Sequence, residues 1–321
     1  MFPVWDCRHS LGVRLSLLLM ACGGAIACGS AIAAAQDVPA QRVQVPRAII
    51  LPSAVVAGAQ ATLAVVDGAG RLVSGVAVEI SGGAGTGAAG SPSEKVTTDS
   101  TGRATFLPPS GPGPLIAKIA GRKIAASSAV VSDKETLVPA GAAADASSLK
   151  VTSYPHVLAI LDRFAIEGRG FRGTADSNHV FLGEQPCLVV ASSPVSLVIL
   201  PGLHIALGSI TLRVRAGGSE TGPMPVTGVL LDFSGPAEVP TAGAEGKLIL
   251  RVHGTTDPLD VEVRNASPEI IQLLHGNLQR VGTSGGEQNI APVEMKFLAS
   301  GNYVVTARLV PADTPNPHGA N

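Results

Sequence analysis

Short apolar runs separated by turn residues recur along most of the chain. Ala61–Val66 and Val76–Ile80 are rich in β-branched residues, and Asp67-Gly68-Ala69-Gly70 stands between them. A second Asp-x-x-Gly turn, Asp99-Ser100-Thr101-Gly102, precedes another run at Ala104–Leu107. Runs of this length, spaced by roughly 8–15 residues with no helical period between them, are typical of sandwich strands. The pattern therefore predicts an all-β fold of tandem β-sandwiches.

Stretches rich in small and turn-forming residues divide these runs into blocks. The predicted division is a first sandwich at 43–133, a linker at 134–148, a second sandwich at 149–232, a third sandwich-like block at 233–310 and a disordered tail at 311–321.

The segment from Ser267 to Leu278 fits two structures. Ser267-Pro268-Glu269 is typical of a helix start, and apolar residues follow it at helical spacing. A glycine at position 276, however, would cost about 1 kcal/mol inside a helix. We therefore expect two strands with a turn at His275-Gly276-Asn277, and a helix is the alternative.

The first 35 residues are predicted to be a signal peptide. Arg8 and Arg14 precede an apolar stretch that begins at Leu15, and Ala33-Ala34-Ala35 provides the small residues of a cleavage site. A membrane anchor is the alternative, since an apolar run of about 20 residues can span a bilayer. Cleavage would leave a mature chain that begins at Gln36 and has no transmembrane span.

Cysteines refine the predicted location. Cys22 and Cys28 each follow a small residue, as in a bacterial lipobox, so lipid attachment at either is a second processing option. Cys7 also lies in the leader, which leaves Cys187 as the one cysteine of the mature chain and excludes an intrachain disulfide. We expect an extracytoplasmic protein that is periplasmic, on the cell surface, secreted or lipid-anchored.

The first block resembles the bacterial Ig-like modules of intimin- and invasin-type surface proteins. The resemblance rests on the stretches Asp67–Val78 and Thr97–Thr105. In such turns the Asp side chain accepts hydrogen bonds from turn amides and the Gly adopts a left-handed backbone. Asp67, Gly70, Asp99 and Gly102 are therefore expected to be structural turn residues.

The second block resembles an IPT/TIG domain, which is also Ig-like. Gly168-Arg169-Gly170-Phe171 matches the Gly-x-Gly-Phe signature of that family, so the resemblance implies that Gly168 and Gly170 are structural. The other matching stretches are Tyr154-Pro155, Phe164–Glu167, Val180–Cys187, Leu197–Pro201 and Gly208–Val214.

Charge and aromatic content exclude or disfavour two classes of ligand. The 321 residues include 23 basic and 24 acidic side chains, so the net charge of −1 gives no footprint for nucleic acid. Aromatic residues make up 3% of the chain, and Trp5 lies in the leader, which leaves Tyr154 and Tyr303 besides the phenylalanines. Sugars usually stack on exposed aromatic rings. The mature chain has few such rings, so a glycan-binding surface is disfavoured.

Catalytic and metal-binding chemistry is not indicated. The sequence has no H-E-x-x-H, and the mature chain has no C-x-x-C. Cys187 is expected to be a small core residue, and Glu167, Glu184 and Glu220 are expected at the surface. Six histidines of the mature chain stand singly, at 156, 179, 204, 253, 275 and 318. We expect no enzyme activity, no cofactor and no metal.

These observations predict a non-catalytic exported protein of tandem Ig-like domains that works in adhesion, interaction or spacing. Its partner would be a protein or a cell-surface component, contacted through loops or edge strands. The alternative is a glycan-binding or accessory protein of a polysaccharide-processing system.

Overall fold

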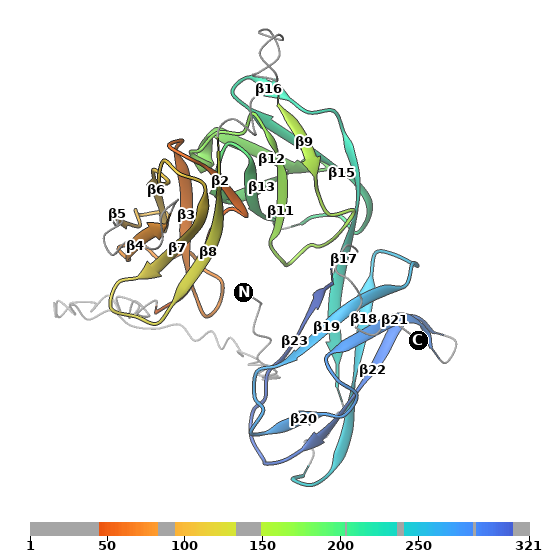
Figure 1. Ribbon diagram of the computed structural model, residues 1–321. Coiled ribbons are helices and arrows are strands. Elements are labelled where there is room, and N and C mark those ends of the chain that lie inside the picture. The colour runs from red at the N-terminus through yellow and green to blue at the C-terminus, as the bar shows by residue number, and fades with distance from the viewer. Residues whose placement is uncertain are drawn as a thin grey trace, which may run out of the picture.

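The computed structural model describes residues 45–82, 94–132, 149–202, 204–235, 241–284 and 287–310, and gives the backbone alone for 283, 284, 287 and 288. The predicted signal peptide, both candidate lipidation cysteines, the linker and the tail lie outside these ranges. Within them the chain is built almost entirely of strands, which form Ig-like sandwiches (Figure 1).

The described part of the first sandwich has eight strands in two layers. They are β1 (Pro46–Ile50), β2 (Ala54–Val56), β3 (Ala61–Asp67), β4 (Ala77–Gly82), β5 (Glu94–Thr97), β6 (Arg103–Phe106), β7 (Gly113–Ile119) and β8 (Ala125–Val131). One layer has the order β2-β8-β7-β4-β5, and in the other β3 pairs with β1 and β6. Strand β7 shows why the sequence folds this way: Leu115, Ala117 and Ile119 enter the core while the residues between them face outward.

The second sandwich carries one 3-10 turn beside its strands. Its elements are β9 (Lys150–Ser153), β10 (Val157–Ala159), β11 (Phe164–Arg169), η1 (Ala175–Ser177), β12 (Asn178–Leu182), β13 (Gln185–Ser192), β14 (Ser196–Leu200), β15 (Gly208–Ala216), β16 (Ser219–Glu220) and the first part of β17 (Met224–Ser234). Strand β13 changes layers, because it pairs with β12 at its start and with β14 further along. A separate core lies between the two layers.

The third sandwich begins inside β17. Its other strands are β18 (Glu245–His253), β19 (Leu259–Asn265), β20 (Ile271–Leu273), β21 (Leu278–Ser284), β22 (Glu287–Phe297) and β23 (Val305–Leu309). The segment that fitted either a helix or two strands forms strands β20 and β21, and Gly276 between them has a φ of 75°. The two-strand prediction is therefore confirmed there.

Strand β17 is shared by two sandwiches. Its residues Met224–Gly228 pair with β15, and Leu230–Ser234 pair with β18 of the third sandwich. The strand runs straight through the position between Asp232 and Phe233 where the sequence suggested a boundary. The third sandwich consequently continues from the second without a linker, whereas the first lies beside the second (Figure 1).

Candidate functional site: the interdomain joint

The contact between the first and second sandwiches is where most of the buried polar side chains gather, and we call it the interdomain joint. It is formed by β3, the turn before β6 and the loop around Ser53 on one side. The other side consists of the segment 172–178, β13 and the turn into β14. At its centre Thr62 of β3 pairs with Ser192 of β13, so the sheets of the two sandwiches join.

Two Asp-containing turns shape the first sandwich near this joint. Asp67, which is 4% exposed, accepts hydrogen bonds from the amides of Ala69 (2.8 Å) and Arg71 (3.0 Å) and from Nε of Arg71 (2.9 Å). Burial alone would raise the pKa of Asp67, but the hydrogen bonds from the Arg71 side chain and the two amides outweigh it and lower that pKa. Gly70 closes the turn with a φ of 79°.

The second turn aims Arg103 at the neighbouring sandwich. Asp99 Oδ1 accepts from the hydroxyl (2.6 Å) and amide (2.8 Å) of Thr101 and from the amide of Arg103 (3.2 Å). The Thr101 hydroxyl is the main cause of the lowered pKa of Asp99. Gly102 has a φ of 73°, and a Cβ there would lie 2.7 Å from the backbone nitrogen of Val73. Both the left-handed backbone and the lack of space for a Cβ therefore require glycine at position 102.

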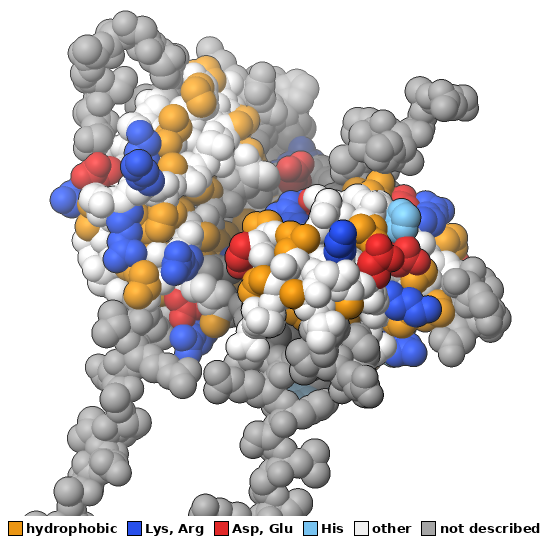
Figure 2. Space-filling view, turned by 90° about the horizontal axis from the view of Figure 1, so that it is seen from below, with side chains coloured by type: hydrophobic (Ala, Val, Ile, Leu, Met, Phe, Trp, Pro, Cys, Tyr) orange, Lys and Arg blue, Asp and Glu red, His pale blue; other side chains and the backbone are white. Residues whose placement is uncertain are grey.

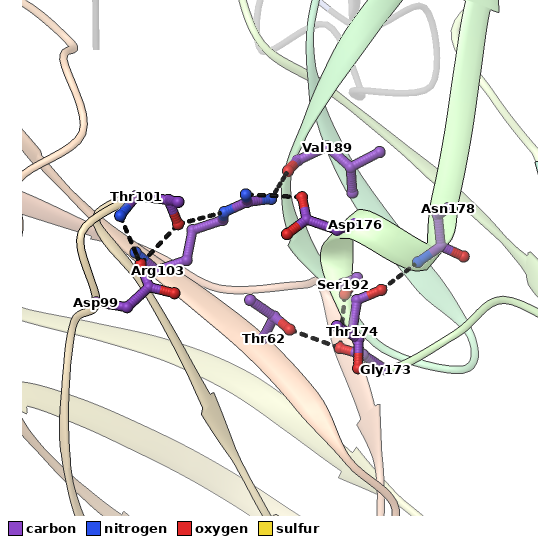
Figure 3. A network of polar contacts seen from close by, with 10 residues as sticks. All are labelled: Thr62, Asp99, Thr101, Arg103, Gly173, Thr174, Asp176, Asn178, Val189 and Ser192. Carbon is purple, nitrogen blue, oxygen red and sulfur yellow. Dashed lines mark hydrogen bonds and ion pairs between the residues drawn. The ribbon is translucent and has the colours of Figure 1, made fainter.

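Arg103 crosses the joint with its guanidinium (Figure 3). Its side chain is held by Thr101, whose hydroxyl accepts from Nε at 3.0 Å. Beyond that, it donates to the carbonyl of Val189 (3.2 Å) and forms an ion pair with Asp176 (2.7 Å). Arg103 is 8% exposed, so the bond to Val189 is made away from water. A charged group buried in this way requires such partners.

A second set of contacts converges on one carbonyl. The carbonyl of Gly173 accepts from the hydroxyls of Thr62 (2.6 Å) and Ser192 (2.7 Å), one from each sandwich (Figure 3). Asn178 holds this loop in place, because its amide group donates to the carbonyl of Thr174 at 3.0 Å. A Cβ at Gly173 would lie 1.9 Å from the carbonyl oxygen of Gln60, so only glycine allows this approach.

A third set is made by serines. Ser53 of the first sandwich contacts Ser196 through their hydroxyls at 2.8 Å and donates to Glu167 at 3.0 Å. Ser193 donates to the carbonyl of Ala54 at 2.7 Å. Ser193 and Ser196 have no exposed surface. These buried hydroxyls are hydrogen-bonded across the joint, as buried polar groups generally must be.

Apolar packing surrounds the polar contacts. Ile50, Ala64 and Val66 of the first sandwich form one buried cluster with Val190 and Ala191 of the second. The joint therefore combines an apolar contact, a sheet junction and hydrogen-bonded polar groups. Such a satisfied buried network favours one relative arrangement of its parts over alternatives.

The other residues predicted to be structural turns lie away from the joint's centre. Gly168 allows β9 and β11 to approach, since a Cβ there would lie 2.2 Å from the carbonyl oxygen of Lys150. Gly170 has a φ of 79°. The sequence pattern did not single out Arg103, Thr62 or Gly173. A weak signal existed in the polar residues at 192, 193 and 196, which interrupt an otherwise apolar hairpin.

The residues considered for catalysis do not converge. Cys187 is half-buried, and burial raises the pKa of its thiol, which disfavours the reactive thiolate. Glu184 and Glu220 both form ion pairs with Arg213 at the surface. Hydrogen bonding from Arg215 lowers the pKa of Glu220, which is the opposite of what a general acid needs.

One hydrolase-like string is present in the chain. Gly282-Thr283-Ser284-Gly285-Gly286 satisfies the spacing G-x-S-x-G. A nucleophile elbow requires a turn from a strand into a helix, but this string joins the paired strands β21 and β22. The match therefore does not indicate a nucleophile.

Residues that could bind a metal ion or a sugar do not converge in the described ranges either. In the described ranges no three His, Cys, Asp or Glu side chains are placed to hold a metal ion, and His318 lies outside them. The ring of Tyr154 packs on the second core, and Tyr303 packs on the third and contacts Phe297 edge-on at 5.7 Å. All eight aromatic residues of the described chain are at least partly buried. No helix in the described part is long and apolar enough to cross a membrane.

Comparisons with known proteins found likenesses among solved structures alone. Neither a family model nor a curated protein matches the chain. Similar solved structures include the plexin A4 extracellular region (9% identity, TM-score 0.30, 84% of this chain and 28% of that one). Invasin, a bacterial integrin-binding protein, is 14% identical (TM-score 0.20, 81% and 55%).

A Bacteroides ovatus protein, SGBP-B of a mixed-linkage glucan utilization locus, was solved with a heptasaccharide. It is 12% identical, with a TM-score of 0.21 and coverage of 85% and 63%. The chain thus spans less than two thirds of each of these structures. With TM-scores of 0.30 or lower, these likenesses carry no argument about this chain. The fold and joint define the class: an all-β protein of Ig-like sandwiches connected by a buried joint and a shared strand.

Proposed function

We propose that this chain is a non-catalytic extracytoplasmic protein that acts in adhesion, interaction or spacing by holding its sandwiches in a fixed relation. The observation that carries the proposal is the interdomain joint. A chain of independent modules would need only a linker, yet here buried hydroxyls and Arg103 connect the first two sandwiches. The shared strand β17 does the same for the second and third.

The proposal includes the finer assignments made from sequence. The first sandwich is proposed to be a bacterial Ig-like module and the second an IPT/TIG module, which the Gly168-Arg169-Gly170-Phe171 signature supports. The divisions at 133 and 148 are part of the same proposal, as is export through the leader at 1–35, while the second and third sandwiches meet within β17 rather than at a break after 232. A glycan-binding role gains little support from the aromatic residues, because seven of the eight in the described chain pack in the cores and the ring of Phe181 is covered by Arg213 and Arg215.

A retention experiment tests this function. Residues 36–321 would be immobilised and offered a cell-envelope fraction, before and after protease treatment, and in parallel a glycan array. The proposal expects retention of a partner that protease destroys and no specific sugar signal. Specific retention of a defined sugar without any protein partner would contradict it.

A further inference from the structure

One end of the first sandwich carries unpaired positive charge. We call it the basic end and define it by Arg47, Lys118, Arg122 and Lys123, all of which are exposed. Arg47 follows the first residue of β1, and the other three belong to the end of β7 and the hairpin into β8. None of the four forms an ion pair within the described chain.

The fold brings these side chains together from separate parts of the sequence. Arg122 donates to the carbonyl of Pro46 at 3.4 Å, which places the β7–β8 hairpin beside the start of β1. Lys118 lies opposite Ala125 in the same hairpin. Strand register places two carboxylates beside this end: Glu79, which lies opposite Lys118, and Asp67, which lies opposite Pro46 and is already bound to Arg71. Positive charge therefore predominates.

Apolar side chains lie among the charges. Ile116 is 38% exposed and shares the outer face of β7 with Lys118, and Val45 at the start of the described chain is 42% exposed. Seen from below, the first sandwich shows Lys and Arg side chains interleaved with hydrophobic ones and fewer acidic side chains, and the third sandwich also carries both signs of charge (Figure 2). Over residues 45–132 the sequence has seven basic and four acidic residues, against six and nine over 229–310.

We infer that the basic end docks on the anionic headgroups of a lipid membrane. Each Lys or Arg near an anionic bilayer contributes to attraction, and exposed aliphatic groups among them favour the lipid interface. An anionic polysaccharide would offer the same charge, but sugar chains usually stack on aromatic rings. Phe106, the one aromatic residue at 45–132, is buried in the core. The chain also enters the first sandwich at this end, directly after the segment that contains the predicted leader.

Vesicle flotation with residues 36–321 tests the inference, because all residues of the three cores lie within 49–309 and are retained. Phosphatidylcholine vesicles with and without phosphatidylglycerol would be compared at low and high salt. We expect binding that requires phosphatidylglycerol and weakens with salt. Arg122→Gln with Lys123→Gln should weaken it roughly tenfold or more.

Two further variants serve as controls. Lys118→Gln with Lys123→Gln removes two charges without touching the Pro46 hydrogen bond, so it should weaken binding even if loss of Arg122 disturbs the hairpin. Arg264→Gln with Arg280→Gln removes two exposed charges from the third sandwich and should leave binding unchanged.

Three results would overturn the inference. They are equal binding to both kinds of vesicle, equal effects of the basic-end and third-sandwich variants, and retention on polygalacturonate beads without binding to anionic vesicles. The inference goes beyond the proposed function, since a spacer that never touches lipid would fail this test with its joint intact.

Discussion

Arg103 is the buried charged side chain that reaches across the interdomain joint. Its partner Asp176 is 73% exposed, so that ion pair contributes little, whereas the bond to the Val189 carbonyl is buried. Truncation would leave that carbonyl without its donor, which costs about 1–3 kcal/mol.

Arg103→Ala is therefore expected to lower the free energy of unfolding by about 1–3 kcal/mol, measured by urea denaturation of residues 36–321. Arg264→Ala is the matched control. It removes an Arg that is 47% exposed from an ion pair at 2.9 Å with Glu262, and should change stability by less than about 0.5 kcal/mol. Equal effects of the two variants would show that the buried bond does not matter.

The lowered pKa of Asp67 predicts that the free energy of unfolding depends on pH. Its pKa in the folded chain lies below the ordinary value of 3.8, so the carboxylate stabilises the fold above that pH. The contribution is lost as the pH falls through the lowered pKa, because protonation then removes the charge in both states. Asp67→Asn should cost about 1–2 kcal/mol near neutral pH, and the difference from wild type should shrink below about pH 4. Urea unfolding of both proteins between about pH 2 and 7 measures this difference in the free energy of unfolding. A difference that stays constant with pH would contradict a stabilising Asp67 carboxylate.

At the scale of elements, β17 determines how the second and third sandwiches meet. Each half of the strand pairs with a different partner, and the carbonyl of Val229 between them accepts from the amide of Ile160 at 2.9 Å. A strand of eleven residues that is paired along both halves leaves no flexible connection.

Insertion of Gly-Gly-Ser between Val229 and Leu230 should turn this strand into a hinge. Each half keeps its own register, so both sandwiches should remain folded while calorimetry resolves separate transitions. The same insertion between Gly217 and Gly218, in the turn from β15 to β16, should leave the thermal profile nearly unchanged. A single transition in both insertion variants would argue against β17 as the coupling element.

Elements were more predictable than their contacts. Runs such as Ala61–Val66 predicted strands because buried strands are built from contiguous β-branched and aliphatic residues. The joint was not predictable in the same way. Arg103 and Val189 stand 86 positions apart, and nothing local in either stretch records that they meet. The continuation of β17 across residue 232 was also missed, since a strand that serves two cores looks like two adjacent strands.

For the whole molecule, Gly173 tests whether the first two sandwiches act as one body. Gly173→Ala would place a methyl group 1.9 Å from the Gln60 carbonyl oxygen, so the joint must open or the loop must shift. We expect the first sandwich to unfold independently and at lower temperature in this variant. Gly222→Ala, also on the second sandwich, meets no atom within 4 Å and should leave the transition in place. If the first sandwich unfolds at the same temperature in the Gly173→Ala and Gly222→Ala variants, the joint does not couple the sandwiches.

The arrangement of the three sandwiches is the central claim, and a distance measurement tests it most directly. Spin labels would be attached through Lys123→Cys on the first sandwich and Lys296→Cys on the third, in residues 36–321 with Cys187→Ser, and the distribution of their separation recorded by pulsed electron resonance. A reference pair within one sandwich, Lys95→Cys with Lys123→Cys, gives the width that the labels alone produce. A joint and a shared strand that fix the geometry predict one distribution nearly as narrow as this reference. A broad distribution over many separations would show that the sandwiches move independently and would contradict the account.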